Sequence, residues 1–190
     1  MSKIRLFHTS PEEIKEIHEE GLFGSQLFFS GNPYFMTQSE DPITYKMDVD
    51  ENELLDINKL PYIDSDDYKK IKPIINEVEK VTGLSESESL DLLSERYSLT
   101  EFFNKLEDYY NFYHEQDKNS EEKSRKLKLY ENLKNKDIGD IEWMIQKFSG
   151  EVAKKLGYKG AILTDEQGSS YLIDMLGRLG DLKKSNMDED

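Results

Sequence analysis

Cysteine is absent from this sequence of 190 residues, and histidine occurs only at His8, His18 and His114. The chain therefore has no disulfide, no thiolate zinc site and no cysteine nucleophile. No two histidines lie four residues apart, as they do on one face of a metal-binding helix, so we expect no metal. The phosphate-loop pattern G-x-x-x-x-G-K-S/T, the dinucleotide pattern G-x-G-x-x-G and the hydrolase pattern G-x-S-x-G are missing too.

Long apolar runs are also missing. The first seven residues are too few and too polar to form the apolar core of a signal peptide. No segment approaches the roughly 20 apolar residues that a membrane-spanning helix needs. We therefore expect a cytoplasmic protein with no membrane partner.

Positive charge is scarce relative to negative charge: 25 Lys and Arg residues stand against 40 Asp and Glu residues, a formal net charge of -15. Such a field repels nucleic-acid phosphates, so no direct binding to nucleic acid is expected. The acidic stretch 48–67 leaves one non-enzymatic interpretation open, an inhibitor that imitates DNA and occupies a basic groove of another protein. The 11 Tyr and 9 Phe residues supply apolar surface for a folded core.

The hydrophobic pattern predicts an α+β fold in a single domain over residues 1–180, with a largely helical, acidic insertion at about 64–136. Short apolar or alternating runs bounded by turn residues predict strands at 4–8, 26–30, 43–49, 161–164 and 169–175. Apolar residues at helical spacing predict helices at 101–116, 120–135 and 138–156. The acidic tail 183–190 is expected to be disordered.

The first predicted strand runs directly into a predicted helix. Ser10-Pro11-Glu12-Glu13 places serine at the N-cap, proline at the first helical position and a glutamate where it would close a capping box. Gly21 follows as a C-cap. A strand that leads straight into a capped helix would put His8 and Thr9 at a mouth where backbone N–H groups point at a ligand.

An acidic turn joins the last two predicted strands. The run Asp165-Glu166-Gln167-Gly168 predicts a β-hairpin with two carboxylates at its bend. A polar turn accounts for these residues without any chemistry, so their position alone leaves a structural and a catalytic interpretation open.

Four short motifs in order resemble a known family. Leu6-Phe7-His8-Thr9-Ser10 resembles the first element of the His-Tyr-Glu class of ADP-ribosyltransferases, and Leu27-Phe28-Phe29-Ser30, with Tyr34 beyond it, resembles the second. The small anti-CRISPR ADP-ribosyltransferases of phages are more similar still. They share Leu-Phe-His-x-Ser-x-Glu-Glu-Ile, Gly-hydrophobic-Phe-Gly, Leu-Gly-Tyr and Asp-Glu-x-Gly, which stand here at 6–14, 21–24, 156–158 and 165–168. The segment 64–136 is unlike this family and is longer than the family needs.

The resemblance implies a pair of small packed β-sheets and a mono-ADP-ribosyltransferase that uses NAD as co-substrate. It also implies a protein acceptor, such as a subunit of a CRISPR effector complex, in the cytoplasm of a phage-infected host. Breaking the nicotinamide–ribose bond develops positive charge on the ribose, which a nearby carboxylate stabilises more in the transition state than in the ground state. By the resemblance this carboxylate is Asp165, with Glu166 as the alternative.

The same resemblance assigns NAD contacts to the N-terminal elements. His8 would hydrogen-bond a ribose hydroxyl, the Thr9 backbone would hold the nicotinamide amide, and Phe29 or Tyr34 would lie against the nicotinamide ring. Ser10 serves either as a helix cap or as a ligand contact. The expected NAD-binding residues are His8, Thr9, Ser10, Phe28, Phe29, Ser30 and Tyr34.

The residues before the acidic turn depart from one pattern of the family. Arginine-modifying relatives carry an acid two residues before the catalytic glutamate, whereas Leu163 and Thr164 stand two before Asp165 and Glu166. Neither side chain prepares an arginine or amide acceptor in that way. An NAD glycohydrolase, which needs no acceptor protein, therefore stays open beside the transferase and the acidic inhibitor.

Overall fold

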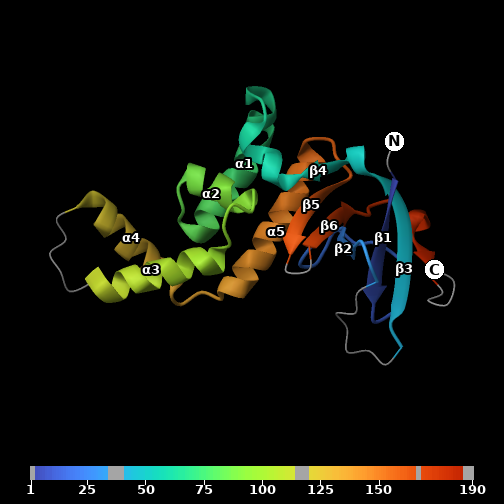
Figure 1. The fold of residues 1–190 in the computed structure, drawn as a ribbon, viewed down its shortest axis with the longest axis horizontal. Helices are drawn as coiled ribbons and strands as arrows, with labels where there is room; N and C mark the ends of the chain where they lie inside the picture. The colour runs from blue at the N-terminus through green and yellow to red at the C-terminus, as the bar shows by residue number, and fades with distance from the viewer. Residues whose placement is uncertain (1–2, 34–40, 114–119, 166–167, 186–190) are drawn as a thin grey trace. The chain divides into compact units, whose positions relative to one another are not determined.

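The computed structural model of the chain describes residues 3–33, 41–113, 120–165 and 168–185. The chain divides into two compact units, coloured along the sequence in Figure 1. The strand unit contains residues Met1–Ile57 and Ser149–Asp190, and the helical unit contains Asn58–Phe148.

The described residues of the strand unit form seven strands, in the sheet order β4-β5-β6-β2-β1-β3-β7. Neighbouring strands are antiparallel except for β4 and β5, which run parallel. Short 3-10 helices follow β3 at Glu51–Glu53 and precede β7 at Leu179–Asp181. The strands are β1 (Lys3–Ser10), β2 (Gln26–Ser30), β3 (Ile43–Asp50), β4 (Leu54–Asp56), β5 (Gly160–Asp165), β6 (Gly168–Asp174) and β7 (Lys183–Lys184).

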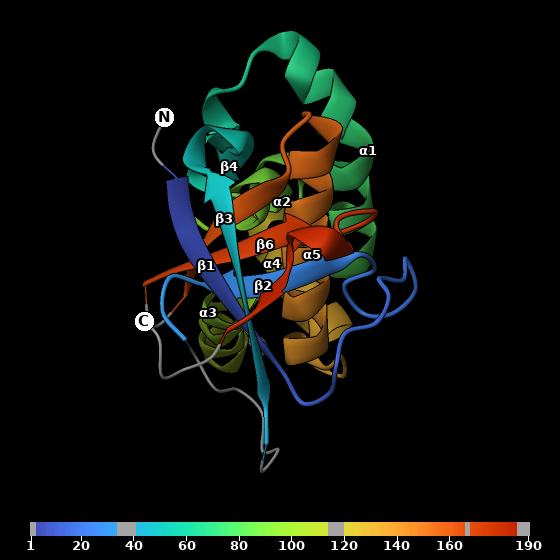
Figure 2. The same cartoon turned by 90° about the vertical axis from the view of Figure 1, so that its right-hand side faces the viewer.

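The sheet consists of two groups of strands that meet at a single residue pair. β1 pairs with β3 along its whole length, and β2 pairs with β6 along its whole length. Between β1 and β2 the only register pair is Phe7 with Ser30. In Figure 2, β1 and β3 run from top to bottom, whereas β2 and β6 run from side to side. The predicted α+β class is confirmed, but in place of a pair of packed sheets the strands form one sheet with two groups. We call them the β1 group (β1, β3, β7) and the β2 group (β2, β6, β5, β4).

One hydrophobic cluster contains residues from both groups. Leu6 and Met47 come from the β1 group, and Phe29 and Ile173 come from the β2 group; all four are buried. Alternate residues of a strand share a face, so His8 lies on the same face of β1 as Leu6, at the end of this cluster.

The helix predicted to begin at Ser10 is wrong. β1 continues to Ser10, which pairs with Ile43, and residues 11–20 have no regular structure. The backbone N–H of Ile14 donates instead to the buried Tyr45 hydroxyl at 2.9 Å. The Glu13 carboxylate forms an ion pair with Lys184. A short isolated helix gains little in water, so these tertiary contacts override the local capping signal.

The tail was expected to be disordered from residue 183, and this is wrong for its first three residues. Lys183 and Lys184 form β7 against β3, and the Ser185 N–H donates to the Thr44 carbonyl at 2.8 Å. Residues 186–190 lie outside the described residues. The predicted strands at 26–30, 43–49, 161–164 and 169–175 are confirmed as β2, β3, β5 and β6.

Among the described residues, five α-helices follow β4 along the chain, after a 3-10 helix at Ile57–Tyr62. The first four lie within the stretch 64–136 for which a helical insertion was expected, while α5 runs from the helical unit into the strand unit. The helices are α1 (Ser65–Thr82), α2 (Glu86–Leu93), α3 (Leu99–Tyr113), α4 (Glu121–Leu133) and α5 (Ile138–Lys155).

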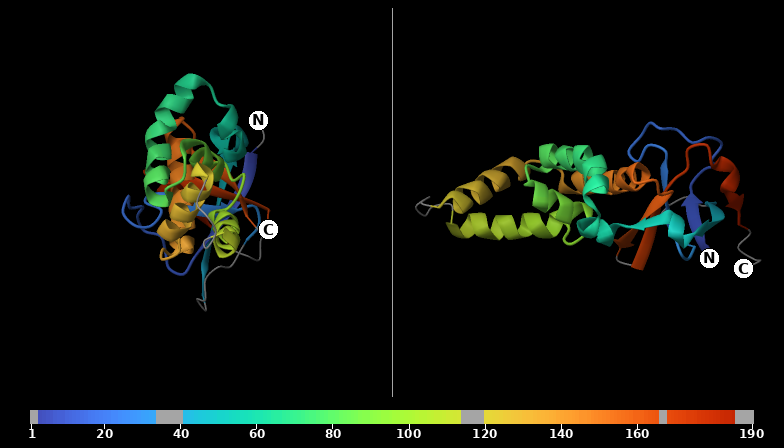
Figure 3. Two further views of the ribbon diagram at one scale, coloured as in Figure 1. Left: turned by 90° about the vertical axis from the view of Figure 1, so that its left-hand side faces the viewer. Right: turned by 90° about the horizontal axis from the view of Figure 1, so that it is seen from above.

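Aromatic rings pack α3 against α4, which lie side by side in the right-hand view of Figure 3. The Tyr130 ring of α4 stacks on Phe103 at 5.6 Å and contacts Tyr110 at 4.4 Å between ring centroids. The Lys126 ammonium lies 5.0 Å from the centre of the Tyr109 ring. Aromatic and cation–π contacts thus supply much of the interface that aliphatic residues supply elsewhere.

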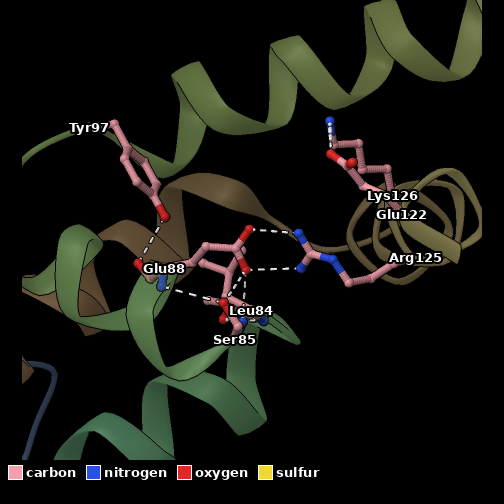
Figure 4. A network of polar contacts seen from close by, with 8 residues as sticks. Leu84, Ser85, Glu88, Tyr97, Glu122, Arg125 and Lys126 are labelled. Carbon is pink, nitrogen blue, oxygen red and sulfur yellow. Dashed lines mark hydrogen bonds and ion pairs between the residues drawn. The ribbon is translucent and has the colours of Figure 1, made fainter.

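A charged network joins α2 to α4, as Figure 4 shows. Both Arg125 Nη atoms donate to the Glu88 carboxylate at 2.9 Å. Ser85, the N-cap of α2, donates to the same carboxylate through its hydroxyl and its backbone N–H. The Tyr97 hydroxyl donates to the Glu88 carbonyl at 2.8 Å. The Arg125 guanidinium is the largest cause that lowers the pKa of Glu88 to about 2.

Gly160→Ala tests the close approach of β5 to β6. A Cβ on Gly160 would lie 2.5 Å from the Leu172 carbonyl oxygen and 2.7 Å from Ile173 Cδ1. Because backbone cannot easily shift within a ladder, we expect the free energy of unfolding to fall by about 2 kcal/mol, measured by urea denaturation. Gly180→Ala, where nothing lies within 4 Å, is the control and should change it by less than about 0.5 kcal/mol. Equal effects of the two variants would contradict the β5–β6 packing.

Glu88→Gln tests the charged network through its pH dependence. A carboxylate whose pKa is lowered by folding stabilises the folded state above its unfolded pKa, and this contribution disappears as the pH falls from about 4.5 towards 2. The side chain is 22% exposed, so we expect the variant to lose about 2 kcal/mol at pH 7 and little at pH 2.

Glu122→Gln is the control for the network, because Glu122 pairs with Lys126 at an exposed position. It should cost less than about 0.5 kcal/mol at either pH. Thermal melts of the three proteins at several pH values make the comparison, and a Glu88→Gln penalty that does not shrink in acid would contradict the role of the carboxylate.

Candidate functional site

The candidate site lies where β1 separates from β2. Beyond Phe7 no residue of β1 pairs with β2 within the described chain, so that edge of residues 8–10 has no strand partner there. The His8 side chain bridges the gap, with Nδ1 2.7 Å from the Phe28 carbonyl oxygen. A side-chain N–H thus takes the place of a backbone N–H at the point where the ladder ends.

The contact with Phe28 fixes the chemical form of His8. A carbonyl only accepts hydrogen bonds, so Nδ1 carries the proton and donates, and in the neutral ring Nε2 is left as an acceptor. Burial lowers the pKa of His8 below its ordinary value of 6.5, and the hydrogen bond to Phe28 opposes this shift to a smaller degree. At neutral pH His8 is therefore an uncharged ring whose Nε2 is able to accept a hydrogen bond.

The two phenylalanines of β2 have different surroundings. Phe29 is 2% exposed, and its ring centroid lies 5.5 Å from that of His8. Phe28 is half-buried and meets Phe23 edge-on at 4.8 Å. The structure thus places Phe29 as a support behind His8, with almost no surface left for a ligand ring to contact.

Thr9 and Ser10 end β1 on its opposite faces. The Thr9 hydroxyl lies 3.5 Å from the Thr44 hydroxyl on β3, on the face away from His8. The Ser10 Oγ lies 3.4 Å from the Glu12 backbone nitrogen, but no helix follows it. Ser10 is therefore a half-buried strand residue on the His8 face, and its expected role as a helix N-cap is wrong.

The acidic hairpin is connected to His8 through neighbouring strands. Ser30 on β2 pairs with Phe7 on β1 and with Ser170 on β6, and its hydroxyl donates to the Asn32 carbonyl. On β5 the last residue, Asp165, pairs with Gly168 at the start of β6. The sheet order from His8 to Asp165 is thus β1, β2, β6 and β5. Tyr34 and Glu166, which were also expected at the site, lie outside the described residues.

Two tyrosines beside these residues were not among the expected site residues. Tyr45 is the register partner of His8 on β3, and Tyr171 is the register partner of Phe29 on β6. The alternating pattern of β3 indicated that Tyr45 faces the core. Tyr171 carried no comparable signal, because its place beside Phe29 depends on which strand pairs with β6.

The described parts of the chain hold neither a metal-binding cluster nor a membrane-spanning helix. Within them no group of three or more His, Asp or Glu side chains is placed to hold a metal ion. None of the helices described there is long and apolar enough to cross a bilayer.

The protein is thus a small α+β protein. Its candidate site contains a neutral histidine at the junction of two strand groups and an acidic hairpin on neighbouring strands. The family model for "Anti-CRISPR Type I-F ADP-ribosyltransferase AcrIF11" matches residues 75–176, just over half of the chain. The chain belongs to this family. The match begins in α1 and ends just after β6, so it includes most of the helical segment that was thought unlike the family, as well as the acidic hairpin.

The chain also resembles a solved structure. A solved structure titled "Crystal structure of an anti-CRISPR protein" is 21% identical, covers 90% of this chain and 89% of its own, and superposes with a TM-score of 0.47. No curated protein sequence matches the chain significantly.

The protonation of His8 gives a direct test of the site. We expect NMR to show the Nδ1–H tautomer and a pKa below 6.5, with the His8→Asn variant used to assign the signal. Because folding lowers this pKa, the contribution of neutral His8 to stability is complete above pH 6.5 and is lost as the pH falls through the folded pKa. An Nε2–H tautomer would contradict the contact with Phe28, and a pKa above 6.5 would contradict the effect of burial on the ring.

Proposed function

We propose that this protein transfers ADP-ribose from NAD to an acceptor protein and thereby inhibits a type I-F CRISPR complex. The family match, which includes the acidic hairpin, is the observation that carries this proposal. The protonation state of His8, near the N-terminus, also supports the proposal. A neutral imidazole ring whose Nε2 is an acceptor is suited to bind a ribose hydroxyl.

His8 holds the ribose in this proposal, and the unpaired edge of β1 holds the amide group beside it. The Phe28 carbonyl keeps Nδ1 occupied, so only Nε2 is available to accept from a ribose hydroxyl. Thr9, which lies beyond the β1–β2 register pair Phe7–Ser30, holds the nicotinamide amide through its backbone in this proposal. Ser10 adds a hydroxyl on the same face as His8.

Phe28, Phe29 and Ser30 shape the site from β2. Phe29 keeps the His8 ring in place from behind, and its burial removes it as the ring that contacts nicotinamide. Ser30 holds β2 at the junction of the two groups, opposite both Phe7 and Ser170. Tyr34 stays a candidate for contact with the nicotinamide ring.

The chemistry needs a carboxylate close to the ribose. The bond between ribose C1′ and the nicotinamide nitrogen breaks, and its electron pair leaves with neutral nicotinamide. A nucleophilic atom of the acceptor forms the new bond to C1′ and releases its proton to solvent. Asp165 stabilises the positive charge that develops on the ribose, with Glu166 next to it as the alternative.

The acceptor is a protein of the type I-F CRISPR machinery that normally contacts DNA, because ADP-ribose adds bulk and two phosphate charges to a surface that must bind phosphates. Leu163 is buried behind the acidic hairpin and cannot prepare an arginine side chain. An acceptor other than arginine is therefore proposed.

The acidic stretch 48–67 gives weaker support to a DNA-imitating inhibitor. Most of its carboxylates are engaged within the protein and do not form a free row of negative charge. Asp50 and Asp64 cap helices. Ion pairs are formed by Asp48 with Arg5, Glu53 with Lys159, Asp66 with Lys69 and Asp67 with Lys70.

Adenine-labelled NAD incubated with the protein and a type I-F complex tests the proposal. We expect nicotinamide release together with transfer of the label to a protein. Asp165→Asn should lower both rates by about 100-fold or more, because it removes the charge that stabilises the transition state. If Glu166→Gln causes that loss instead, the acid is Glu166. Glu19→Gln, an exposed carboxylate far along the chain from the hairpin, is the control.

Three other results would contradict the proposed transferase activity. Nicotinamide release without any labelled protein indicates a glycohydrolase. Binding to the complex that needs no NAD, weakens steeply with salt and survives His8→Ala indicates the acidic inhibitor. Absence of NAD binding and of complex binding excludes all three activities.

A further inference from the structure

We propose that one face of α3 binds the positively charged, DNA-contacting surface of the acceptor protein. This inference rests on the proposed function, since it names where the acceptor of that reaction would bind. The face in question, which we call the outer face of α3, consists of exposed residues on the side turned away from α4: Glu101, Asn104, Lys105, Asp108, Asn111 and Phe112.

The two sides of α3 have different surroundings. On one side Phe103 and Tyr110 contact the Tyr130 ring of α4, and Leu106 is buried. The outer-face residues follow one another at intervals of three or four along the chain, as residues on a single side of a helix do. Helix packing within the helical unit thus uses one side of α3 and leaves the other exposed.

Phe112 is the apolar centre of the outer face. It is 67% exposed, more than any other large and wholly apolar side chain among the described residues, although phenylalanine is ordinarily buried. Its ring meets Tyr113 edge-on at 4.6 Å between centroids, and Tyr113 lies 4.6 Å from Tyr109. Because neighbouring rings hold it, Phe112 offers an ordered apolar surface whose removal from water would favour binding.

Polar side chains surround Phe112 on the outer face. Asp108 lies one helical turn before it, and Asn104 and Asn111 flank this row. Within the described part of the chain, these three side chains form no hydrogen bond or ion pair. Protein interfaces commonly combine an aromatic anchor with a rim of polar groups that bond to the partner. The outer face of α3 has this composition.

Charge determines which partner fits this face. The Lys105 ammonium pairs with the Glu101 carboxylate at 2.6 Å, so the unpaired charge on the outer face is the carboxylate of Asp108. The whole chain has a formal net charge of -15. A protein that normally contacts DNA phosphates presents positive charge, which is complementary to this face. A second copy of this chain would place like charges against each other, so the acceptor is the favoured partner.

Binding to a purified type I-F complex, measured by biolayer interferometry without NAD, tests the inference separately from catalysis. For Phe112→Ser we expect the affinity to fall by about 10-fold, mostly through faster dissociation, because an interface anchor is lost. Phe112→Tyr keeps the ring and should bind within about 2-fold of the wild type. Asp108→Asn should slow association by about 2-fold at low salt and have no effect at about 0.5 M salt.

Two control variants separate this face from the rest of the surface. Tyr62→Ser removes an aromatic residue of the helical unit that is 80% exposed, and Glu51→Gln removes one exposed negative charge from the strand unit. Both should bind the complex within about 2-fold of the wild type. All the variants should keep the melting temperature and the NAD affinity of the wild type. In transfer assays, Phe112→Ser should raise the KM for the complex and leave kcat unchanged.

Each other result has a distinct meaning. If the wild type transfers ADP-ribose and folded Phe112→Ser binds the complex equally well, the inference is wrong while the proposed function stands. Equal losses in Phe112→Ser and Tyr62→Ser would also contradict the inference. If sedimentation shows a wild-type dimer that Phe112→Ser dissociates, the outer face binds a second copy and the inference is wrong. If the wild type binds the complex through Phe112 but transfers nothing, the binding surface is supported while the proposed function fails.

Discussion

The hydrogen bond from His8 Nδ1 to the Phe28 carbonyl is the interaction on which the site depends. It lies where the two strand groups part, so a side chain supplies the donor that β1 no longer supplies through its backbone. The same bond decides the tautomer, and the burial that accompanies it keeps the ring neutral. Phe29 supports the ring from behind. The contact thus fixes the position and the tautomer of His8, and burial keeps its ring uncharged.

The family match and the histidine come from different parts of the chain. The matched residues 75–176 contain helices and the β5–β6 hairpin but not β1, β2 or β3. The sheet brings the two parts together, since β6 pairs with β2 along its whole length. The helical segment is part of the family pattern, and within it the Glu88–Arg125 pair fastens α4 to α2.

Local patterns in the sequence predicted much of the strand unit. The alternation of apolar and polar residues over 43–49 predicts a strand, and the turn residues that follow Asp165 predict a hairpin. Both signals are local, so they can be recognised without tertiary information. The capping signal at Ser10 did not produce a helix, because the Ile14 N–H donates instead to the hydroxyl of Tyr45. Tyr45 is 35 residues after Ser10 in the sequence. For the site, His8 was recognisable from its motif, whereas the burial of Phe29 and the position of Tyr171 depend on strand register. Register between β2 and β6 is set by core packing of distant segments, which a single sequence does not reveal.

A crystal structure of the Asp165→Asn variant grown with NAD would show directly whether the junction of the two strand groups binds NAD through His8. We expect NAD at the junction of the two strand groups, with a ribose hydroxyl donating to His8 Nε2 while Nδ1 keeps its bond to the Phe28 carbonyl. NAD bound away from β1 and β2, or a His8 ring turned so that Nδ1 faces the ligand, would contradict it.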